Sequence, residues 1–501
     1  MQLTPADATI RRQLAAAVLT LLGASLAQAA PVDAGAGTRQ PPLEIDPSLM
    51  PAPGMTAPPV PAAAKDLGPY TLEPHASHDV ALPQASVDQP WRADGGFLYY
   101  AEGDGRVQTA EAVVQVSKLF ADESSLNLRV VVDSLTGGSP NGALPSRAAQ
   151  TFSTPSGSTL NAGTASAPQT YTTASGSVAS SGNGTHSAVY TIAPGALPLD
   201  KSFMDERLGL NISREQGLDA WNRLTYGAAV SREHDFMSGS ASMSIAHDLD
   251  NRNTTLSLGA NLEADLIEPI GGAPVPWSDY GKFLKQGNKS KRVGDLLLGV
   301  TQVVSRRWIT QLNYSLDRSN GYQNDPYKIL SVLDKLGATT GYVYENRPDS
   351  RLRQSLYWEN KYALDHDVIE LSLRYLHDDW GVTSTTADFR YHLKFGATNY
   401  LEPHWRRYHQ SAANFFRFYL TQGDPALQNA SADPRLAAFD ANTLGLKFGT
   451  SLGQNSEFSI RVERYTQTGN GPANVPPGLQ GLNLYPGLQA WMVQGGLSSV
   501  F

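Results

Sequence analysis

Long segments in which apolar and polar side chains alternate residue by residue follow one another through most of this chain. In TTLSLGANLEADL, for example, Leu256, Leu258 and Leu262 fall on one face, while Glu263 and Asp265 fall on the other. The same alternation recurs in the segments 307–317, 351–364, 388–395, 441–452 and 457–463. Alternation with a period of two residues is the pattern of a strand that has two unlike faces. Many such segments in succession predict an all-β protein.

The connections between these segments predict the architecture. Short polar connections mostly alternate with long or irregular ones, and the long ones cover 136–200, 267–292, 319–350, 421–440 and 467–487. Transmembrane β-barrels have short periplasmic turns, longer extracellular loops and strands of about 9–11 residues. We therefore predict a transmembrane antiparallel β-barrel of about 16 strands, with both ends of the barrel chain in the periplasm. The expected strands lie near 96–101, 106–119, 124–135, 203–214, 221–232, 236–248, 253–266, 293–305, 306–318, 351–364, 366–378, 384–395, 405–420, 441–452, 457–466 and 488–501.

The alternative architecture is a soluble β-sandwich or propeller of an exported protein. Too many residues of the polar faces are charged for that packing, and no repeat of blade length appears. The placement of aromatic residues also favours a membrane barrel, because amphipathic rings gather at the two membrane interfaces. Trp221, Trp308 and Tyr362 fall at predicted periplasmic strand ends, whereas Tyr280 and Trp380 fall near outer ends.

The N-terminal region predicts export. Arg11 and Arg12 precede the apolar stretch LAAAVLTLLGASLA, which ends at an Ala-Gln-Ala site over 27–29. A basic start, a short apolar stretch and a small-residue site predict a cleaved signal peptide over 1–29, rather than a buried helix. The predicted location is therefore the cell outer membrane of a Gram-negative bacterium.

The segment that follows the signal peptide is rich in Pro and Ala. Residues 30–94 show no periodicity and are predicted to form a disordered periplasmic tether, although a specific periplasmic partner is an alternative. The predicted barrel then covers 95–501. The chain contains 0 cysteines, which excludes disulfides and thiolate metal sites. A net charge of -8 argues against a general nucleic-acid binder.

The polar faces of the strands carry a mixed set of charges that would point into the barrel. This set includes Glu263, Asp265 and Asp317, together with the residues that we predict to line a pore. These are Arg351, Arg353, Glu359, Lys361, Glu370, Arg374, Asp388, Arg390, His392, Lys394, Arg417, Lys447, Arg461 and Glu463. They would form either the wall of a water-filled channel or an ion-pair network inside a plugged barrel. A slight excess of cations would favour anions in an open channel.

The longest predicted loop, 136–200, is almost free of charge and consists largely of Ser, Thr, Gly and Ala. Such a tract cannot bury enough apolar surface to fold by itself. It would either stand outside the barrel as a flexible surface loop or fold inward and narrow the pore. The sequence favours the first alternative.

The chain offers little support for catalysis, and we predict no catalytic residue, no cofactor and no metal. His377 and Asp378 are adjacent in a strand and would point to opposite faces. His404 and His409 would also lie on opposite faces, which argues against a shared metal ion. The segment DLDNRN (248–253) reads as a polar hairpin turn, because a calcium loop would need a Glu at its last position, where Gly259 stands. The protein is therefore not expected to be an enzyme.

Two motifs resemble those of a known family. VVDSLTGGSP (131–140) and LEPHWRRYHQSAANFFRFYL (401–420), together with TTLSLGAN and a terminal Phe, are similar to a proteobacterial outer-membrane β-barrel family classed as a domain of unknown function. The chain departs from the family pattern at Gly138 and His409, and in its long Ser/Thr-rich loop. The resemblance implies a single barrel and a link to an envelope redox system. It also implies that Phe501 is the signal through which the barrel assembly machinery recognises the last strand.

These features lead to two hypotheses about function. The first is a porin-like, passive or weakly selective channel for small solutes, with outer-membrane lipid and the barrel assembly machinery as partners. The second is a closed barrel that acts as a surface or scaffold protein, possibly for the envelope redox system. No sequence feature identifies a solute, and no partner of the tether is predicted.

Overall fold

The protein is described here by a computed structural model. It covers residues 91–153, 170–172, 178–180, 189–201, 203–269, 271–423, 425–453, 455–485 and 487–500. The predicted signal peptide, nearly all of the predicted tether, most of the Ser/Thr-rich tract and Phe501 lie outside these residues. No helix within the described ranges has the length and apolar character needed to span a membrane.

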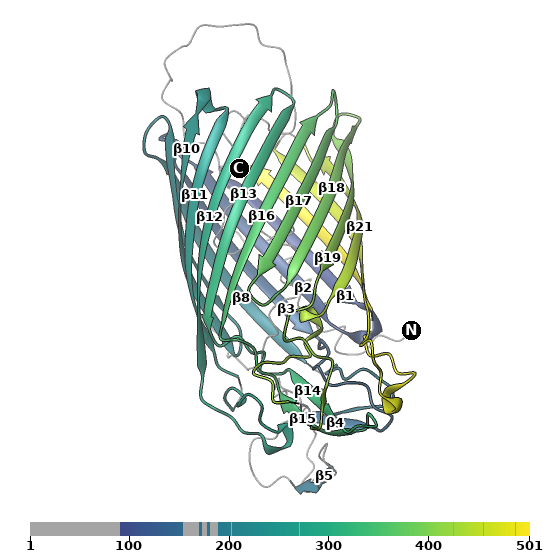
Figure 1. The fold of residues 1–501 in the computed structure, drawn as a ribbon. Coiled ribbons are helices and arrows are strands. Elements are labelled where there is room, and N and C mark those ends of the chain that lie inside the picture. The colour runs from purple at the N-terminus through teal and green to yellow at the C-terminus, as the bar shows by residue number, and fades with distance from the viewer. Residues whose placement is uncertain are drawn as a thin grey trace, which may run out of the picture. The chain divides into compact units, whose positions relative to one another are not determined.

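Sixteen antiparallel strands form one closed barrel, which confirms the predicted fold class (Figure 1). In ring order they are β1 (Arg92–Glu102), β2 (Gln108–Leu119), β3 (Ser125–Thr136), β8 (Met204–Gly217), β9 (Asn222–Arg232), β10 (Phe236–Leu249), β11 (Thr254–Ile267), β12 (Lys289–Ser305), β13 (Trp308–Gly321), β16 (Ser350–Ala363), β17 (Val368–Asp378), β18 (Thr383–Phe395), β19 (Asn399–Gln410), β21 (Phe439–Ser451), β22 (Ser456–Gly469) and β23 (Leu488–Val500). The ring closes where β1 pairs with β23, from Arg92 opposite Val500 to Glu102 opposite Ala490. Its first strand thus begins slightly before the predicted start at 95.

The remaining elements belong to the connections. β15 (Thr339–Tyr344), β14 (Ile329–Leu333) and β20 (Leu420–Thr421) form a three-stranded sheet. β4 (Gln150–Ser153) pairs with β7 (Val189–Ile192), and β5 (Thr170–Thr172) pairs with β6 (Val178–Ser180). The short 3-10 helices are η1 (Gly103–Gly105), η2 (Asp250–Arg252), η3 (Tyr280–Lys282), η4 (Pro434–Leu436) and η5 (Pro477–Leu479). β14, β15 and β4 lie at the lower end of the barrel in Figure 1, which we call the long-loop end.

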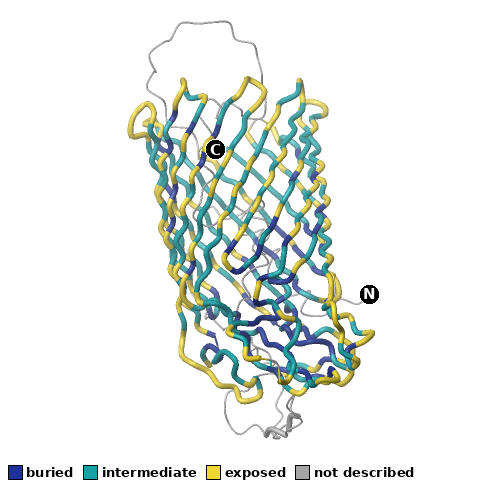
Figure 2. Tube along the Cα trace, in the orientation of Figure 1, coloured by how far each residue is buried: buried dark blue, intermediate teal, exposed yellow. Residues whose placement is uncertain are grey.

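Apolar residues face outward and polar residues face inward in the barrel wall, which is the reverse of the arrangement in a soluble protein. On β11, Leu258 and Leu262 keep 45% and 71% of their surface exposed, whereas Asn261 and Asp265 keep only 3% and 1%. Exposed and less exposed residues accordingly alternate along the strands in Figure 2, and buried residues gather at the long-loop end. Polar residues that face inward and apolar residues that face outward are what a barrel needs in order to stand in lipid.

Aromatic residues mark the short-turn end of the barrel, as predicted. Trp221, Trp308 and Tyr362 are 45%, 39% and 43% exposed there. The prediction for the opposite end was wrong. Trp380 is only 4% exposed and packs against Phe415, with 5.0 Å between the ring centroids. Rings that were expected at the outer membrane interface therefore belong to the packed interior of the loops.

One predicted strand is misplaced. The sequence pattern indicated 405–420, but β19 runs from Asn399 to Gln410 and the chain then leaves the wall. Pro403 lies inside β19, where it has no N–H to donate, and the pairing of β19 with β18 is interrupted at Glu402 and Pro403. The neighbouring pairs continue on both sides, so the ring tolerates this interruption. Beyond Gln410 the alternating aromatic run packs into the loops instead of facing lipid.

Candidate functional site

The inner wall of the barrel carries a chain of ion pairs across β16, β17 and β18. The Lys361 Nζ atom lies 3.1 Å from Glu359 Oε1 and 3.2 Å from Glu370 Oε2. The Arg390 guanidinium continues the chain, 3.0 Å from Glu370 Oε1 and 3.4 Å from Asp388 Oδ1. Inward-facing positions of neighbouring strands thus hold opposite charges side by side, as cross-strand pairing favours.

His404 of β19 extends this chain. Its Nε2 lies 2.8 Å from Asp388 Oδ2 and its Nδ1 lies 2.7 Å from Glu463 Oε1. A carboxylate at each ring nitrogen is satisfied by the doubly protonated imidazolium, which donates to both. Because the side chain is buried and both nitrogens are engaged, His404 joins strands and has no free nitrogen for catalysis.

A glycine makes the His404–Glu463 contact possible. Gly445 of β21 lies between the two residues in the register, opposite His404 on one side and Glu463 on the other. A Cβ atom at Gly445 would lie 2.6 Å from Glu463 Oε1, so only glycine leaves room for that side chain to cross β21. The chain then continues from Arg461 to Glu402, at 2.6 Å, and from Glu402 to His392, at 3.6 Å.

Further ion pairs stand nearer to the long-loop end. Arg353 donates to both carboxylate oxygens of Asp317, at 3.0 and 2.9 Å, and Arg351 Nε donates to Asp378 at 2.7 Å. Lys291 lies 3.0 Å from Asp265. These contacts correspond to the ion-pair network that the sequence left as one of two alternatives.

The structure brings most of the predicted pore-lining residues together on the inner wall. Ten of them take part in the ion pairs described above. These are Arg351, Arg353, Glu359, Lys361, Glu370, Asp388, Arg390, His392, Arg461 and Glu463. Arg374 lies over the ring of Tyr357, and Lys447 lies over the ring of Tyr400. Lys394 shares the inward face of β18 with Arg390 and His392. Whether these residues line a conducting pore remains a prediction.

Arg417 is the exception among these residues. It is exposed in the loop after β19, where its Nη1 donates to the carbonyl oxygens of Asn414 and Phe416. The misplaced strand also hid Glu402 and His404, which belong to the wall. An extension of the alternation backwards through LEPHWRRYHQ would have identified both residues. Since Arg417 leaves the wall while Glu402 and Asp378 join it, the predicted excess of cations has no basis.

The long connections fold into a cap over the mouth at the long-loop end. We use "cap" for the described residues of 137–203, 268–288, 322–349, 411–438 and 470–487. Ile329 N donates to Asn141 O at 2.9 Å, although the two loops are separated on the ring by β8, β9, β10, β11, β12 and β13. Because six strands of a ring of 16 separate these loops, their contact must cross the mouth.

Two other contacts cross the mouth in the same way. Trp277 Nε1 donates to Gln428 O at 3.3 Å, and Gly478 N donates to Leu336 O at 2.8 Å. Each contact again joins loops that lie six strands apart on the ring. The cap is therefore a set of bridges between distant sides of the barrel.

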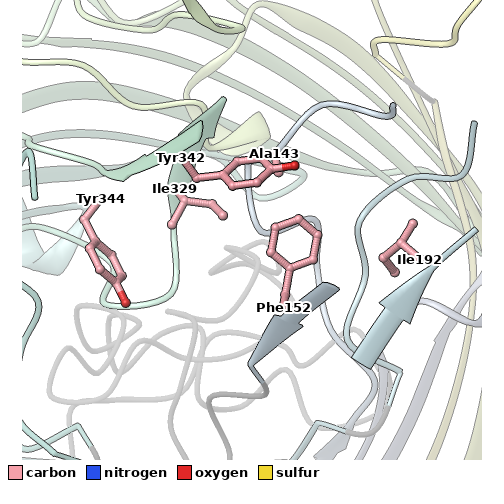
Figure 3. Packing of buried hydrophobic residues seen from close by; sticks show 6 residues of the cluster. All are labelled: Ala143, Phe152, Ile192, Ile329, Tyr342 and Tyr344. Carbon is pink, nitrogen blue, oxygen red and sulfur yellow. The ribbon is translucent and has the colours of Figure 1, made fainter. Parts of the chain in front are cut away.

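An apolar cluster joins two loops of the cap (Figure 3). It joins Ala143, Phe152 and Ile192 of the first long loop to Ile329, Tyr342 and Tyr344 of the loop between β13 and β16. The Phe152 ring lies 5.2 Å from the Tyr342 ring in an edge-on arrangement. The ends of the loop predicted at 136–200 are thus packed rather than free, while most of its Ser/Thr-rich centre lies outside the described residues.

The motif over 131–140 supplies the contact between these loops. Gly142, just after it, has a φ of 94°, and a Cβ there would lie 2.3 Å from Ile329 O. Lys328 is fully buried and donates from Nζ to Ser139 Oγ at 2.8 Å and to Pro140 O at 2.7 Å. The family-like motif therefore anchors the first long loop to β14.

Lys328 belongs to a cluster of three cations and three anions, which we call the buried charge cluster. Its members are Asp325, Lys328, Glu345, Arg347, Asp433 and Arg435. Arg347 bridges two loops, 2.7 Å from Glu345 Oε1 and 2.8 Å from Asp433 Oδ2. Arg435 lies 2.8 Å from Asp325 Oδ2. The cluster fixes the loop between β13 and β16 to the loop between β19 and β21.

Burial and charge act in opposite directions within this cluster. Burial lowers the pKa of Lys328 and raises the pKa of Glu345. Burial alone would also raise the pKa of Asp433, but the three surrounding cations outweigh that effect and hold this pKa well below its ordinary range. Asp433 is therefore ionised at neutral pH and holds its cations in place.

The structure assigns no catalytic arrangement to the histidines considered from sequence. His377 is exposed on the outer face while Asp378 is buried on the inner one, as predicted. His409 is exposed and lies 3.1 Å from Asp440, far from the buried face that holds His404. Among the described residues no group of three or more His, Cys, Asp or Glu is placed to hold a metal ion. DLDNRN forms the turn between β10 and β11 and contains η2.

The solved structures that this chain is similar to include two siderophore receptors and CdiB, at low sequence identity. The ferric enterobactin receptor PfeA of Pseudomonas aeruginosa is 10% identical, with a TM-score of 0.37 over 77% of this chain and 54% of that chain. CdiB of Acinetobacter baumannii is 8% identical, with a TM-score of 0.39 over 81% of this chain and 60% of that chain. The siderophore receptor PirA of Pseudomonas aeruginosa is 9% identical, with a TM-score of 0.34 over 76% and 56% of the two chains. This chain thus spans less than two thirds of each.

The family assignment rests on sequence. None of the curated proteins matches this chain. One family model, described as "Protein of unknown function (DUF3570)", matches residues 60–499, which include every strand of the barrel from β1 to β22 and nearly all of β23. The match confirms the resemblance drawn from the two motifs, and the chain belongs to this family of outer-membrane β-barrel proteins of unknown function.

Proposed function

We propose that the protein is a gated channel of the outer membrane, whose outer mouth is closed at rest by the cap. The observation that carries this proposal is the set of contacts between loops six strands apart on the ring. A barrel of about this size has room for an aqueous path unless something fills it. The charged inner wall supports a path for small polar solutes rather than for apolar ones.

This proposal modifies the porin-like channel predicted from sequence. A passive porin needs an open mouth, whereas the cap crosses the mouth with hydrogen bonds, an apolar cluster and the buried charge cluster. Passage would therefore require the cap to loosen. The same proposal includes export through a cleaved signal peptide, a tether in the periplasm and assembly through Phe501. These three parts rest on sequence alone.

The second candidate is a closed barrel that serves as a surface or scaffold protein. The buried charge cluster favours it, because buried ion pairs are costly to separate. The ion-pair chain of the inner wall would then serve to stiffen the barrel. In this case the cap would remain closed under every condition, and its outer surface would be the functional part.

An engineered disulfide tests the gate. Asn346 and Ala430 form a bridge with hydrogen bonds in both directions, at 3.0 and 2.9 Å, between two loops of the cap. Such pairs have Cα atoms about 5.5 Å apart, which suits a disulfide. Because the native chain has 0 cysteines, Asn346→Cys with Ala430→Cys would form no other disulfide. Conductance of full-length protein in planar lipid bilayers is the measurement.

We expect rare, brief openings of the wild type, none of the oxidised double variant, and recovery of the openings when the disulfide is reduced. Each single-cysteine variant, treated with the same oxidant, is the matched control. Frequent openings of the oxidised protein would contradict a gate at the cap. If neither wild type nor reduced variant ever conducts, while heat-modifiable gel migration shows folded barrels, the scaffold candidate is favoured.

A further inference from the structure

Two arginines of the barrel wall point away from the lumen at the long-loop end. Arg292 of β12 and Arg318 of β13 are both exposed, and they stand on the same face as Leu296 and Leu298, which are 38% and 47% exposed. In the register Arg292 lies opposite Asn320, and Arg318 lies opposite Gly294. The two arginines are therefore diagonal neighbours on the outer surface, within reach of one ligand.

Within the described part of the chain, neither Arg292 nor Arg318 makes an ion pair or a side-chain hydrogen bond. Two outward arginines elsewhere on the wall are engaged: Arg407 lies 2.7 Å from Asp440, and Arg464 lies over the Trp491 ring and donates to Gln489. Two adjacent guanidinium groups on a lipid-facing surface repel each other unless an anion lies between them.

The residues around the pair place it at the edge of the apolar belt. Small residues adjoin it, because Ala264 lies opposite Arg292 and Gly294 lies beside Arg318. Leu296 and Leu316 follow on the side toward the membrane centre. An arginine on the lipid face is costly at the midplane of the membrane and costs little near the interface. The pair is thus expected at the depth of the lipid headgroups.

We propose that Arg292 and Arg318 bind the phosphate of an anionic lipid headgroup in the outer leaflet. Guanidinium groups match phosphate oxygens with paired N–H donors. The small neighbours leave room for a headgroup beside the strands, and the leucines below offer a surface for its acyl chains. That combination of charge and apolar surface suits a lipid better than free phosphate. The inference rests on membrane residence and is independent of the gate.

Lipid retention by the full-length protein tests this site. The protein is stripped of lipid in neutral detergent, and phosphatidylglycerol or phosphatidylcholine is added back. Native mass spectrometry then counts the lipids that remain bound. We expect wild type to retain phosphatidylglycerol roughly ten-fold better than phosphatidylcholine, the effect of about one charge-assisted hydrogen-bonded pair. The Arg292→Gln, Arg318→Gln double variant should lose that preference.

Arg407→Gln is the matched control, because it removes an outward arginine that already has a carboxylate partner. It should retain the wild-type preference. Arg292→Lys with Arg318→Lys should retain part of it, since the charge remains but the paired donors are lost. Heat-modifiable gel migration establishes that every variant is folded. Equal retention of both lipids by wild type, or an unchanged preference in the glutamine variant, would overturn the proposal. Displacement of the lipid by an equal concentration of inorganic phosphate would overturn its assignment to a lipid.

Discussion

At the scale of single residues, the inner wall depends on side chains that cross over glycines. Glu463 reaches His404 only because Gly445 has no Cβ between them. Gly449 has the same role for Tyr400, whose ring lies over it and whose hydroxyl donates to Glu457 Oε1 at 2.7 Å. Sequence alternation predicts which of these residues face inward. It does not predict the contacts, because each one joins strands that are distant in the chain.

Gly445→Ala should weaken the barrel. The added Cβ would meet Glu463 at 2.6 Å and push its carboxylate away from His404. Overpacking at such a site costs about 1–3 kcal/mol. We expect the temperature at which folded protein converts to the slow-migrating form on a gel to fall. Gly239→Ala is the control, because nothing lies within 4 Å of its added Cβ. Equal temperatures for both variants would argue against the crossing contact as a source of stability.

At the scale of elements, the strands were the most predictable part of the molecule. Apolar and polar residues must alternate along a strand that has lipid on one side and polar side chains on the other. The sequence of such a strand therefore indicates which residues face outward and limits its register. The prediction failed at Pro403 and in the aromatic run after Gln410. There the apolar residues are buried against Trp380 and Leu436, far away in the sequence, and local pattern cannot distinguish such burial from contact with lipid.

The cap should loosen in acid. Asp433 has a depressed pKa, so its contribution to stability is complete above its ordinary pKa of about 3.9 and is lost progressively as the pH falls below it. The raised pKa of Glu345 acts in the opposite direction, but its effect no longer changes below about pH 4. We expect more frequent openings in planar bilayers at about pH 3 than at about pH 4.

Asp433→Asn separates this effect from other acid-sensitive groups. It removes the carboxylate that holds Arg347 and Arg435, and breaking a buried pair costs about 3–5 kcal/mol. The variant should therefore open at neutral pH and respond less to acid. A wild-type-like closed state of this variant at neutral pH would show that Asp433 does not hold the cap.

At the scale of the whole molecule, the charges on the inner wall of the barrel determine which ions would pass if the cap opened. The excess of cations expected from sequence does not hold, because Arg417 lies in the cap while Glu402 and Asp378 lie on the wall. Most inward charges are paired, so an opened barrel should show weak ion selectivity. The pairing could not be predicted, because it depends on ring order and on the relative height of strands.

Arg353→Ala in the Asp433→Asn background should shift the opened barrel toward cations. The substitution leaves Asp317 without the guanidinium that now bonds both of its oxygens. One unit charge about 8 Å from a permeating ion in water changes its energy by about 0.5 kcal/mol, or roughly two-fold in the permeability ratio. Reversal potentials in a KCl gradient measure this ratio. Arg407→Gln in the same background is the control and should leave the ratio unchanged. A shift toward anions in the Arg353→Ala variant would contradict the inward placement of the pair.

The bridges across the mouth also constrain the order of assembly. Loops rooted six strands apart can meet only when the strands between and beyond them have curved into a ring, which is complete once β1 pairs with β23. That pairing joins the two ends of the barrel chain and carries the largest loop-closure cost in the fold. The cap should therefore form last, so protection of its loops from protease would report on a finished barrel, and a stalled intermediate would expose them.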